Sequence, residues 1–168
     1  MTACERSNNG WGTLRHHWYF RTVIAAALLM PIVACTSKEP QMVDPKDLET
    51  IKLGEVVHLS ELLKQPAHAV CVLTPYRDRL DENEPLSGQI NSYLTTKNLT
   101  LYEGEWALVF VNGDNVSVQI FSRQQHYMVS RHEGVPKNFK PVDCTSVGRA
   151  LVTKVLNLWP ALIIGEER

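Results

Sequence analysis

The sequence predicts an α+β fold in which a small antiparallel β-sheet carries one or two helices on a face. Three observations predict this class: two β-rich runs flank a turn at residues 112–115, an apolar β-like run covers residues 69–73, and apolar residues recur at helical spacing over residues 85–97. We expect these elements in one globular domain over residues 47–168, after a signal peptide and a short tether.

Residues 1–34 have the layout of a secretory signal peptide. A basic segment that ends at Arg21 precedes a short apolar segment. The apolar run has about 13 residues, whereas a helix needs roughly 20 to cross a bilayer, and Pro31 interrupts it. The sequence therefore predicts export without a permanent transmembrane span.

The apolar segment ends in Ile32-Val33-Ala34-Cys35, where small residues stand directly before a cysteine. These four residues resemble the lipobox of bacterial lipoproteins; the alternative is an ordinary cleaved signal in which the cysteine is incidental. The resemblance implies cleavage before Cys35 and acylation of this cysteine, and several acyl chains anchor a protein stably in a membrane. Thr36, in place of Asp, implies sorting to the outer membrane, with the protein facing the periplasm.

Residues 35–46 are expected to form the acylated cysteine and a flexible tether. This segment has few apolar residues and contains Pro40 and Pro45. The folded domain is expected to begin at Asp47.

The predicted strands surround a hairpin. Trp106–Val111 and Val116–Phe121 flank Asn112-Gly113-Asp114-Asn115, whose residues tolerate the positive φ of a tight turn. The first run is apolar on both faces and is expected to be central, whereas the second run alternates and is expected to turn Val116, Val118 and Ile120 inward and Ser117 and Gln119 outward. Residues 69–73 form an earlier strand that Pro75 ends, and residues 126–130 are a candidate fourth strand.

Three helices are predicted. The first covers residues 85–97, with Leu86, Ile90, Tyr93 and Leu94 on one face and Asn98 at its end. The spacing of apolar residues over 147–155 indicates a second, and residues 61–65 form a third, short helix that Ser60 caps.

Cysteine usage predicts one disulfide. Cys4 leaves with the signal and Cys35 is consumed by the lipid, so that Cys71 and Cys144 remain in the exported chain, where thiols usually pair. The closed loop of 74 residues corresponds to a stabilisation of roughly 4 kcal/mol. A metal or redox pair is the alternative, although the sequence has neither a CxxC motif nor clustered His and Cys residues.

The charge of the exported part argues against nucleic acid as a partner. Residues 35–168 carry 14 Lys and Arg and 17 Asp and Glu, a net charge of −3. The acidic cluster at residues 78–84 is interpreted as a solvated loop.

The search for catalytic motifs assigns no catalytic residue, no metal site and no cofactor. The sequence has no GxSxG, no GxxxxGK[ST] and no GxGxxG pattern. The four remaining histidines do not form a zinc motif, and His126 and His132 are interpreted as polar surface residues.

Three segments are candidate binding surfaces. Tyr76, Arg77 and Arg79 place an aromatic ring beside two arginines, a combination enriched at protein interfaces. Residues 121–127 join two predicted strands. The apolar stretch 159–164 is the third candidate, although packing onto the core as a final strand is the preferred interpretation.

A compact acylated domain with a Val70-Cys71-Val72 strand, a later hairpin and a late cysteine at 144 resembles the periplasmic lipoproteins assigned as immunity proteins of type VI secretion systems. The resemblance covers Val70 to Cys144 and implies binding to a toxin that arrives in the periplasm. The expected function is therefore a non-enzymatic, protein-binding envelope lipoprotein. The alternatives are an accessory component of a secretion or envelope assembly, or a periplasmic hydrolase whose residues converge only in space.

Overall fold

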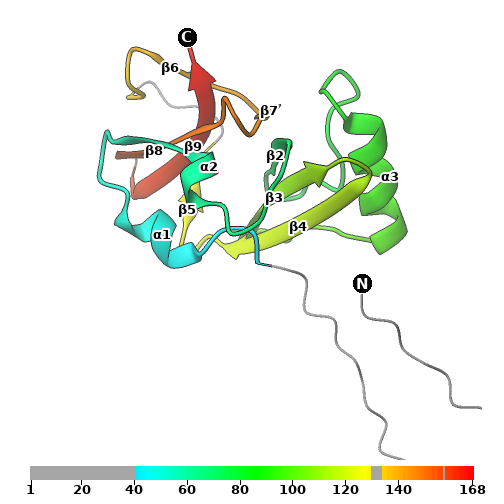
Figure 1. Cartoon of the computed structure of the whole chain (residues 1–168). Helices are drawn as coiled ribbons and strands as arrows, with labels where there is room; N and C mark the ends of the chain where they lie inside the picture. Colours follow the sequence, from blue (N-terminus) through cyan, green and yellow to red (C-terminus); the bar gives the residue numbers. More distant parts are fainter. Residues whose placement is uncertain (1–40, 130–133, 157) are drawn as a thin grey trace, which may run out of the picture. The chain divides into compact units, whose positions relative to one another are not determined.

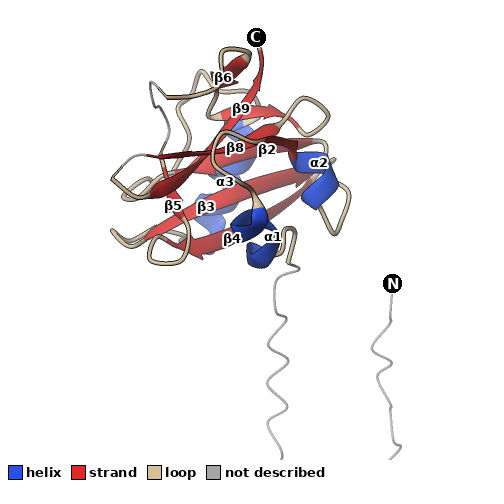
Figure 2. Ribbon diagram, turned by 90° about the vertical axis from the view of Figure 1, so that its left-hand side faces the viewer, coloured by secondary structure: helices blue, strands red, loops and turns tan. Residues whose placement is uncertain are grey.

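The computed structural model describes residues 41–129, 134–156 and 158–168 of the chain (Figures 1 and 2). The predicted signal peptide and Cys35 lie outside these residues. The helices are α1 (Pro45–Thr50), α2 (Leu59–Leu62) and α3 (Ser87–Lys97). The strands are β1 (Val56–His58), β2 (Ala69–Leu73), β3 (Glu105–Asn112), β4 (Asn115–Ser122), β5 (Tyr127–Met128), β6 (Phe139–Pro141), β7 (Cys144–Ser146), β8 (Leu151–Leu156) and β9 (Pro160–Glu167).

The first sheet has the strand order β4-β3-β2-β7, and all its pairs are antiparallel. The predicted strand at residues 69–73 and the predicted hairpin are confirmed as β2 and as β3 with β4. The interior of β3, from Trp106 to Val111, is buried on both faces, as expected for a strand with a neighbour on each side.

The hairpin turn has glycine at the position where the backbone requires it. Asn112 pairs with Asn115, so Gly113 and Asp114 form a two-residue loop. Gly113 has φ +60°, whereas Asp114 does not have a positive φ. A positive φ at only the first loop residue is typical of a type II′ turn, in which glycine occupies that position.

The second sheet was not predicted as a separate sheet. It has the order β1-β8-β9-β5, and β6 also pairs with β9. The β5 pair with β9 is parallel and the other pairs are antiparallel. The fold is therefore consistent with α+β but is mainly β, with two sheets in place of the single expected sheet.

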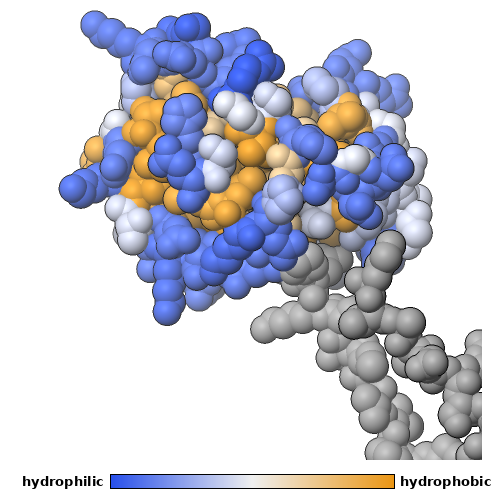
Figure 3. Space-filling model, in the orientation of Figure 1, coloured by the Kyte–Doolittle hydropathy of each residue, from blue (hydrophilic) through white to orange (hydrophobic). Residues whose placement is uncertain are grey.

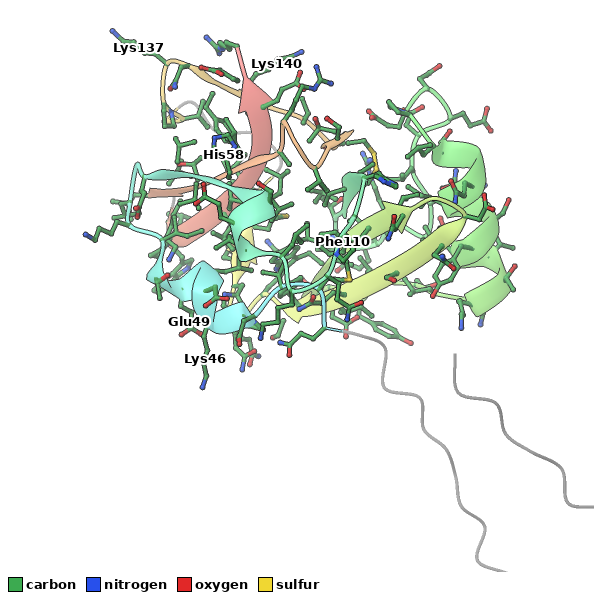
Figure 4. All side chains as sticks on the ribbon, in the orientation of Figure 1. Lys46, Glu49, His58, Phe110, Lys137 and Lys140 are labelled. Carbon is green, nitrogen blue, oxygen red and sulfur yellow. A yellow bond between two sulfur atoms is a disulfide. The ribbon has the colours of Figure 1, made fainter. Side chains whose placement is uncertain are left out.

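The largest hydrophobic core lies between the two sheets and unites alternate residues of both. Trp106, Leu108 and Phe110 of β3 belong to it, together with Val152 of β8 and Leu162 of β9. Figure 4 shows Phe110 at the centre of the side-chain array. The rings of Trp106 and Phe121 stack at a centroid distance of 4.3 Å. The inter-sheet core reaches the surface on the side that carries α2 (Figure 3), where Leu62 and Leu63 are partly buried.

Helix α3 covers the opposite face of the first sheet. Ile90 and Leu94 pack against Ala107, Val109 and Val111 of β3 in a second core. Asn98 adopts the left-handed conformation as the C-cap, as expected for the end of this helix. The predicted start was two residues early: Leu86 is an exposed N-cap and does not belong to the buried face.

The helix predicted over residues 147–155 is wrong. Residues 144–146 form β7, a turn follows, and Leu151–Leu156 form β8 between β1 and β9. The β-branched residues Val152, Thr153 and Val155 favour a strand. The Thr153 hydroxyl donates to the Glu55 carbonyl at 2.7 Å, a contact that helical spacing cannot reveal.

Three further expectations required adjustment. The short helix begins at Leu59 and ends at Leu62, and His58 is its N-cap in place of Ser60. Ile120 of β4 is exposed although an inward orientation was expected, while Val118 does pack inward, under α3. The candidate fourth strand is reduced to β5, and residue 130 lies outside the described part.

The folded domain begins before Asp47, so the expected tether boundary at residue 46 is too late. Met42 and Val43 are buried, and their backbone N–H groups both donate to the Gln119 side-chain oxygen at 2.9 Å. The Gln119 amide in turn donates to the Val43 carbonyl at 2.7 Å. Asp44 then caps α1 through the Lys46 N–H, and Pro45 occupies the first turn.

Candidate functional site

A groove lies where the ends of the two sheets meet. It encloses about 590 Å³ and is open to solvent on one side. The residues that line it come from the loop before β3, the β4–β5 connection, and the start of β9: Glu103, Arg123, Gln124, Gln125, Tyr127, Trp159 and Pro160.

Arg123 is the central residue of this groove. Its backbone N–H donates to the Gly104 carbonyl at 2.7 Å, which extends the β3–β4 ladder by one pair. Its guanidinium group lies 4.5 Å from the centroid of the Tyr127 ring, within the range of a cation–π contact. Nη1 makes only a long contact of 3.4 Å with the Glu103 carbonyl, and the buried Nε has no hydrogen-bond partner within the described structure. Arg123 therefore retains donor capacity for an acceptor that a ligand could supply.

Aromatic and apolar side chains form the other side of the groove. Tyr127 is held by the pairing of β5 with β9, where it lies opposite Ala161. Trp159 and Leu158 precede β9, and 70% and 88% of their surfaces are exposed. An exposed tryptophan beside a stacked arginine combines the two residue types that are most enriched at interface hot spots.

Tyr76 is the member of the predicted arginine loop that adjoins this groove. It has φ +63° and its ring is exposed. Partial desolvation, followed by the nearby Glu103 carboxylate, raises the pKa of Tyr76, and Arg123 opposes that shift. Tyr76 therefore interacts electrostatically with Glu103 and Arg123, two residues that line the groove.

Arg77 and Arg79 do not converge on the groove. Arg77 lies 4.0 Å from the Asp143 carboxylate, and Arg79 lies 3.3 Å from Asp78. Both side chains are more than half exposed, so these ion pairs contribute little to stability. Tyr76, Arg77 and Arg79 together line a separate, shallow hollow in their own loop. They do not line the groove that contains Arg123 and Trp159.

His126 is a buried residue and not the surface histidine that was expected. It is 5% exposed, and its carbonyl accepts a 2.5 Å hydrogen bond from the Trp106 indole N–H. The His126 Nε2 atom lies 3.8 Å from the carboxylate of Glu49 in α1 and has no hydrogen-bond partner within the described part. Figure 4 shows Glu49 at the surface. Burial lowers the pKa of His126, and the neighbouring Lys154 acts in the same direction, while Glu49 opposes them. Burial therefore favours the neutral form of His126, whose backbone carbonyl ties the β4–β5 connection to Trp106.

The disulfide between Cys71 and Cys144 is present. The two residues face each other in the β2–β7 ladder with their Cα atoms 4.1 Å apart. Cys71 is buried beneath α3, as its apolar neighbours indicated. The bond joins the short strand β7 to the middle of the first sheet.

Other chemical features were searched over the same residues. No cluster of three or more His, Cys, Asp or Glu side chains suited to a metal ion occurs within the described ranges. Nor does any helix in these ranges have the length and apolar character needed to span a membrane.

The sequence contained partial signals for the groove. Two of its three candidate surface segments, residues 121–127 and 159–164, meet there, and the preferred interpretation of the second as a final strand is confirmed by β9. Glu103 carried no signal beyond its charge, because its proximity to Arg123 depends on the hairpin register. No protein-family model, curated protein or solved structure matches this chain.

Proposed function

We propose that the chain is a lipid-anchored envelope protein that faces the periplasm and binds another protein without catalysis. Its partner site is the groove around Arg123, and neutralisation of a periplasmic toxin is the special case that the sequence resemblance favours. The observation that supports a binding role is the half-buried Arg123 guanidinium, which stacks on Tyr127 and has a buried Nε without a hydrogen-bond partner in the described structure.

The chemistry of the groove suits a protein surface. Arg123 offers N–H donors to a carbonyl or carboxylate oxygen, and a buried donor that gains a partner strengthens binding because its desolvation cost is already present in the free protein. Trp159 and Leu158 offer exposed apolar area beside it. Glu103 offsets the charge of Arg123, so the groove favours a mixed polar and apolar partner over a strongly acidic one.

The membrane anchor rests on Cys35, which lies outside the described residues. In bacteria that produce the full chain, metabolic labelling with a fatty-acid analogue is expected to mark the wild-type protein. The Cys35→Ser variant is expected to accumulate as an unlabelled, uncleaved precursor. Labelling of that variant would contradict the proposed anchor.

The partner site is tested by photo-crosslinking from position 159 in cells of the source organism. A photoreactive amino acid in place of Trp159 is expected to give a specific protein adduct, whereas the same substitution at exposed Leu53 is not. The captured partner is then titrated against purified variants. Arg123→Gln and Trp159→Ala are each expected to raise the Kd by at least about 30-fold, as hot-spot residues do, and Leu53→Ala should leave it unchanged.

The identity of the partner distinguishes the special cases. A toxin whose lethality in the periplasm is suppressed by wild-type protein but not by Arg123→Gln supports immunity. A component of a secretion or envelope machine supports the accessory role instead. Equal Kd values for the groove variants and the Leu53 control would contradict the assignment of the groove.

A further inference from the structure

Strand β4 is a long sheet edge, and no strand in the described ranges pairs with its outer side. The other strands at the margins of the two sheets, β1, β5, β6 and β7, have two or three residues each, whereas β4 has eight. Figure 1 shows β4 along the margin of its sheet with no other labelled strand beyond it. Residues 115–122 include no charged residue, proline or glycine, and the ladder with β3 runs without a bulge. Short length, charges, prolines and bulges are the usual means by which proteins prevent edge pairing.

The register identifies the backbone groups that point outward from β4. The Arg123 N–H bonds to the Gly104 carbonyl in the same register as the ladder, and hydrogen-bonded pairs alternate along an antiparallel pair. Residues 115, 117, 119 and 121 therefore bond to β3, and Val116, Val118 and Ile120 direct their N–H and C=O groups to the free edge. These six groups have no hydrogen-bond partner in the described part of the chain.

We propose that the edge of β4 pairs with β4 of a second copy of this chain, antiparallel and around a twofold axis at Val118. This register places Val118 opposite Val118 and Val116 opposite Ile120 of the other copy. All six outward groups of each copy then form hydrogen bonds. A register shifted by one pair would place Val116 opposite Ser122, whose carbonyl already accepts from the N–H groups of Gln125 and His126.

Side chains and charges fit the same arrangement. Ile120 is an exposed apolar residue in the middle of an edge, 47% accessible, and it packs against Val116 of the other copy. A strand without charges can pair with itself without placing like charges opposite each other. At each end, Asp114 of one copy lies within one residue of Arg123 of the other, so the flanking charges are complementary.

Cysteine cross-linking tests both the contact and its register. In the proposed register, residue 117 lies opposite residue 119 of the other copy, and these two residues do not share backbone hydrogen bonds. The native disulfide joins Cys71 and Cys144 at a position of the same kind in the β2–β7 ladder. Two differently tagged full-length chains, Ser117→Cys and Gln119→Cys, are produced together and separately. A disulfide-linked dimer is expected only when the two are produced together. No dimer, or a dimer with Gln119→Cys alone, would overturn the proposal.

Light scattering on the full-length chain in detergent provides the second measurement. The wild type is expected to form a dimer, and Ile120→Lys is expected to raise the dimer Kd at least about tenfold, because two lysines enter the interface by symmetry. Tyr102→Lys, at an exposed aromatic residue in the turn before β3 and outside the proposed β4 pairing, is the matched control and remains dimeric. Trp159→Ala also remains dimeric, which separates this interface from the groove. A monomeric wild type, including one that binds only a different protein at β4, would overturn the proposal.

Discussion

The two sheets of this protein are built from different kinds of connection. The first sheet contains the β3–β4 hairpin, which a two-residue turn closes, and a disulfide that fixes its far strand β7. In the second sheet, β1 pairs with β8, almost one hundred residues later, and β9 is the hub for three other strands. Each sheet therefore contains one hairpin between consecutive strands, β3–β4 in the first and β8–β9 in the second. The first sheet adds a covalent bond, whereas the second relies on long-range pairing of β1, β5 and β6.

This comparison predicts that the first sheet is most sensitive to the loss of its covalent bond. Cys71→Ser is expected to lower the free energy of unfolding by about 2 to 5 kcal/mol, because the unfolded chain regains the entropy of the open loop. Chemical denaturation of the oxidised wild type and the variant measures the difference. The Cys71→Ser/Cys144→Ser double variant should behave like either single variant, since both remove the same bond. Equal stability of the wild type with and without reductant would contradict the expectation.

The second sheet should be most sensitive at Gly165, where β9 passes β6. A Cβ atom at residue 165 would overlap the Phe139 ring and the Lys140 carbonyl. To relieve this overlap, β6 and β9 would have to move apart, which would break the Pro141–Gly165 pair. Gly165→Ala is expected to cost about 1 to 3 kcal/mol by overpacking.

Gly88 of α3 is the matched control for this substitution, because a Cβ atom at Gly88 meets nothing within 4 Å. Gly88→Ala is expected to stabilise the domain by about 0.5 to 1 kcal/mol through helix propensity. Thermal unfolding of the two variants measures opposite shifts. If the unfolding temperature shifted in the same direction for both variants, crowding at β9 would not be the cause of the change at Gly165.

His126, in the connection between β4 and β5, predicts a pH dependence of the free energy of unfolding. Burial holds the pKa of His126 below its ordinary value of 6.5, so the unfolded chain binds this proton more readily. Its contribution to stability is complete above pH 6.5 and is lost as the pH falls below it, by at most about 1.4 kcal/mol per pH unit. His126→Phe removes this titration and should flatten the stability profile between pH 7 and 5. An unchanged profile would contradict the assignment to His126.

The smallest effect is expected at the turn of the first sheet. Gly113→Ala places a Cβ atom at φ +60° and is expected to cost about 1 kcal/mol. Gly113→Asn should cost less, because asparagine tolerates a positive φ. Equal losses for both variants, measured by denaturation, would indicate that the turn conformation is not the cause.

The candidate site shows the same division between local and distant information. The sequence identified Tyr76, the connection 121–127 and the stretch 159–164 as separate surface candidates. The convergence of the last two required the parallel pairing of β5 with β9, for which no turn signal exists. Arg77 and Arg79 stay beside Tyr76 in a separate hollow, where their partners are Asp143 and Asp78, so the predicted arginine loop is not part of the groove.

The sequence alone determined those features that depend on neighbouring residues: the Gly113 turn, the central strand β3 with apolar residues on both faces, and the helix that ends at Asn98. It also selected Cys71 and Cys144 as a pair, because they are the two thiols that the predicted signal cleavage and acylation of Cys35 would leave. The tertiary structure decided the rest. Residues 151–156 have an apolar spacing that suits a helix as well as a strand, and only the pairing with β1 and β9 makes them β8. Burial of His126 likewise depends on α1 and Trp106, which lie far from it in sequence, because side-chain packing between distant segments leaves no periodic pattern in the chain.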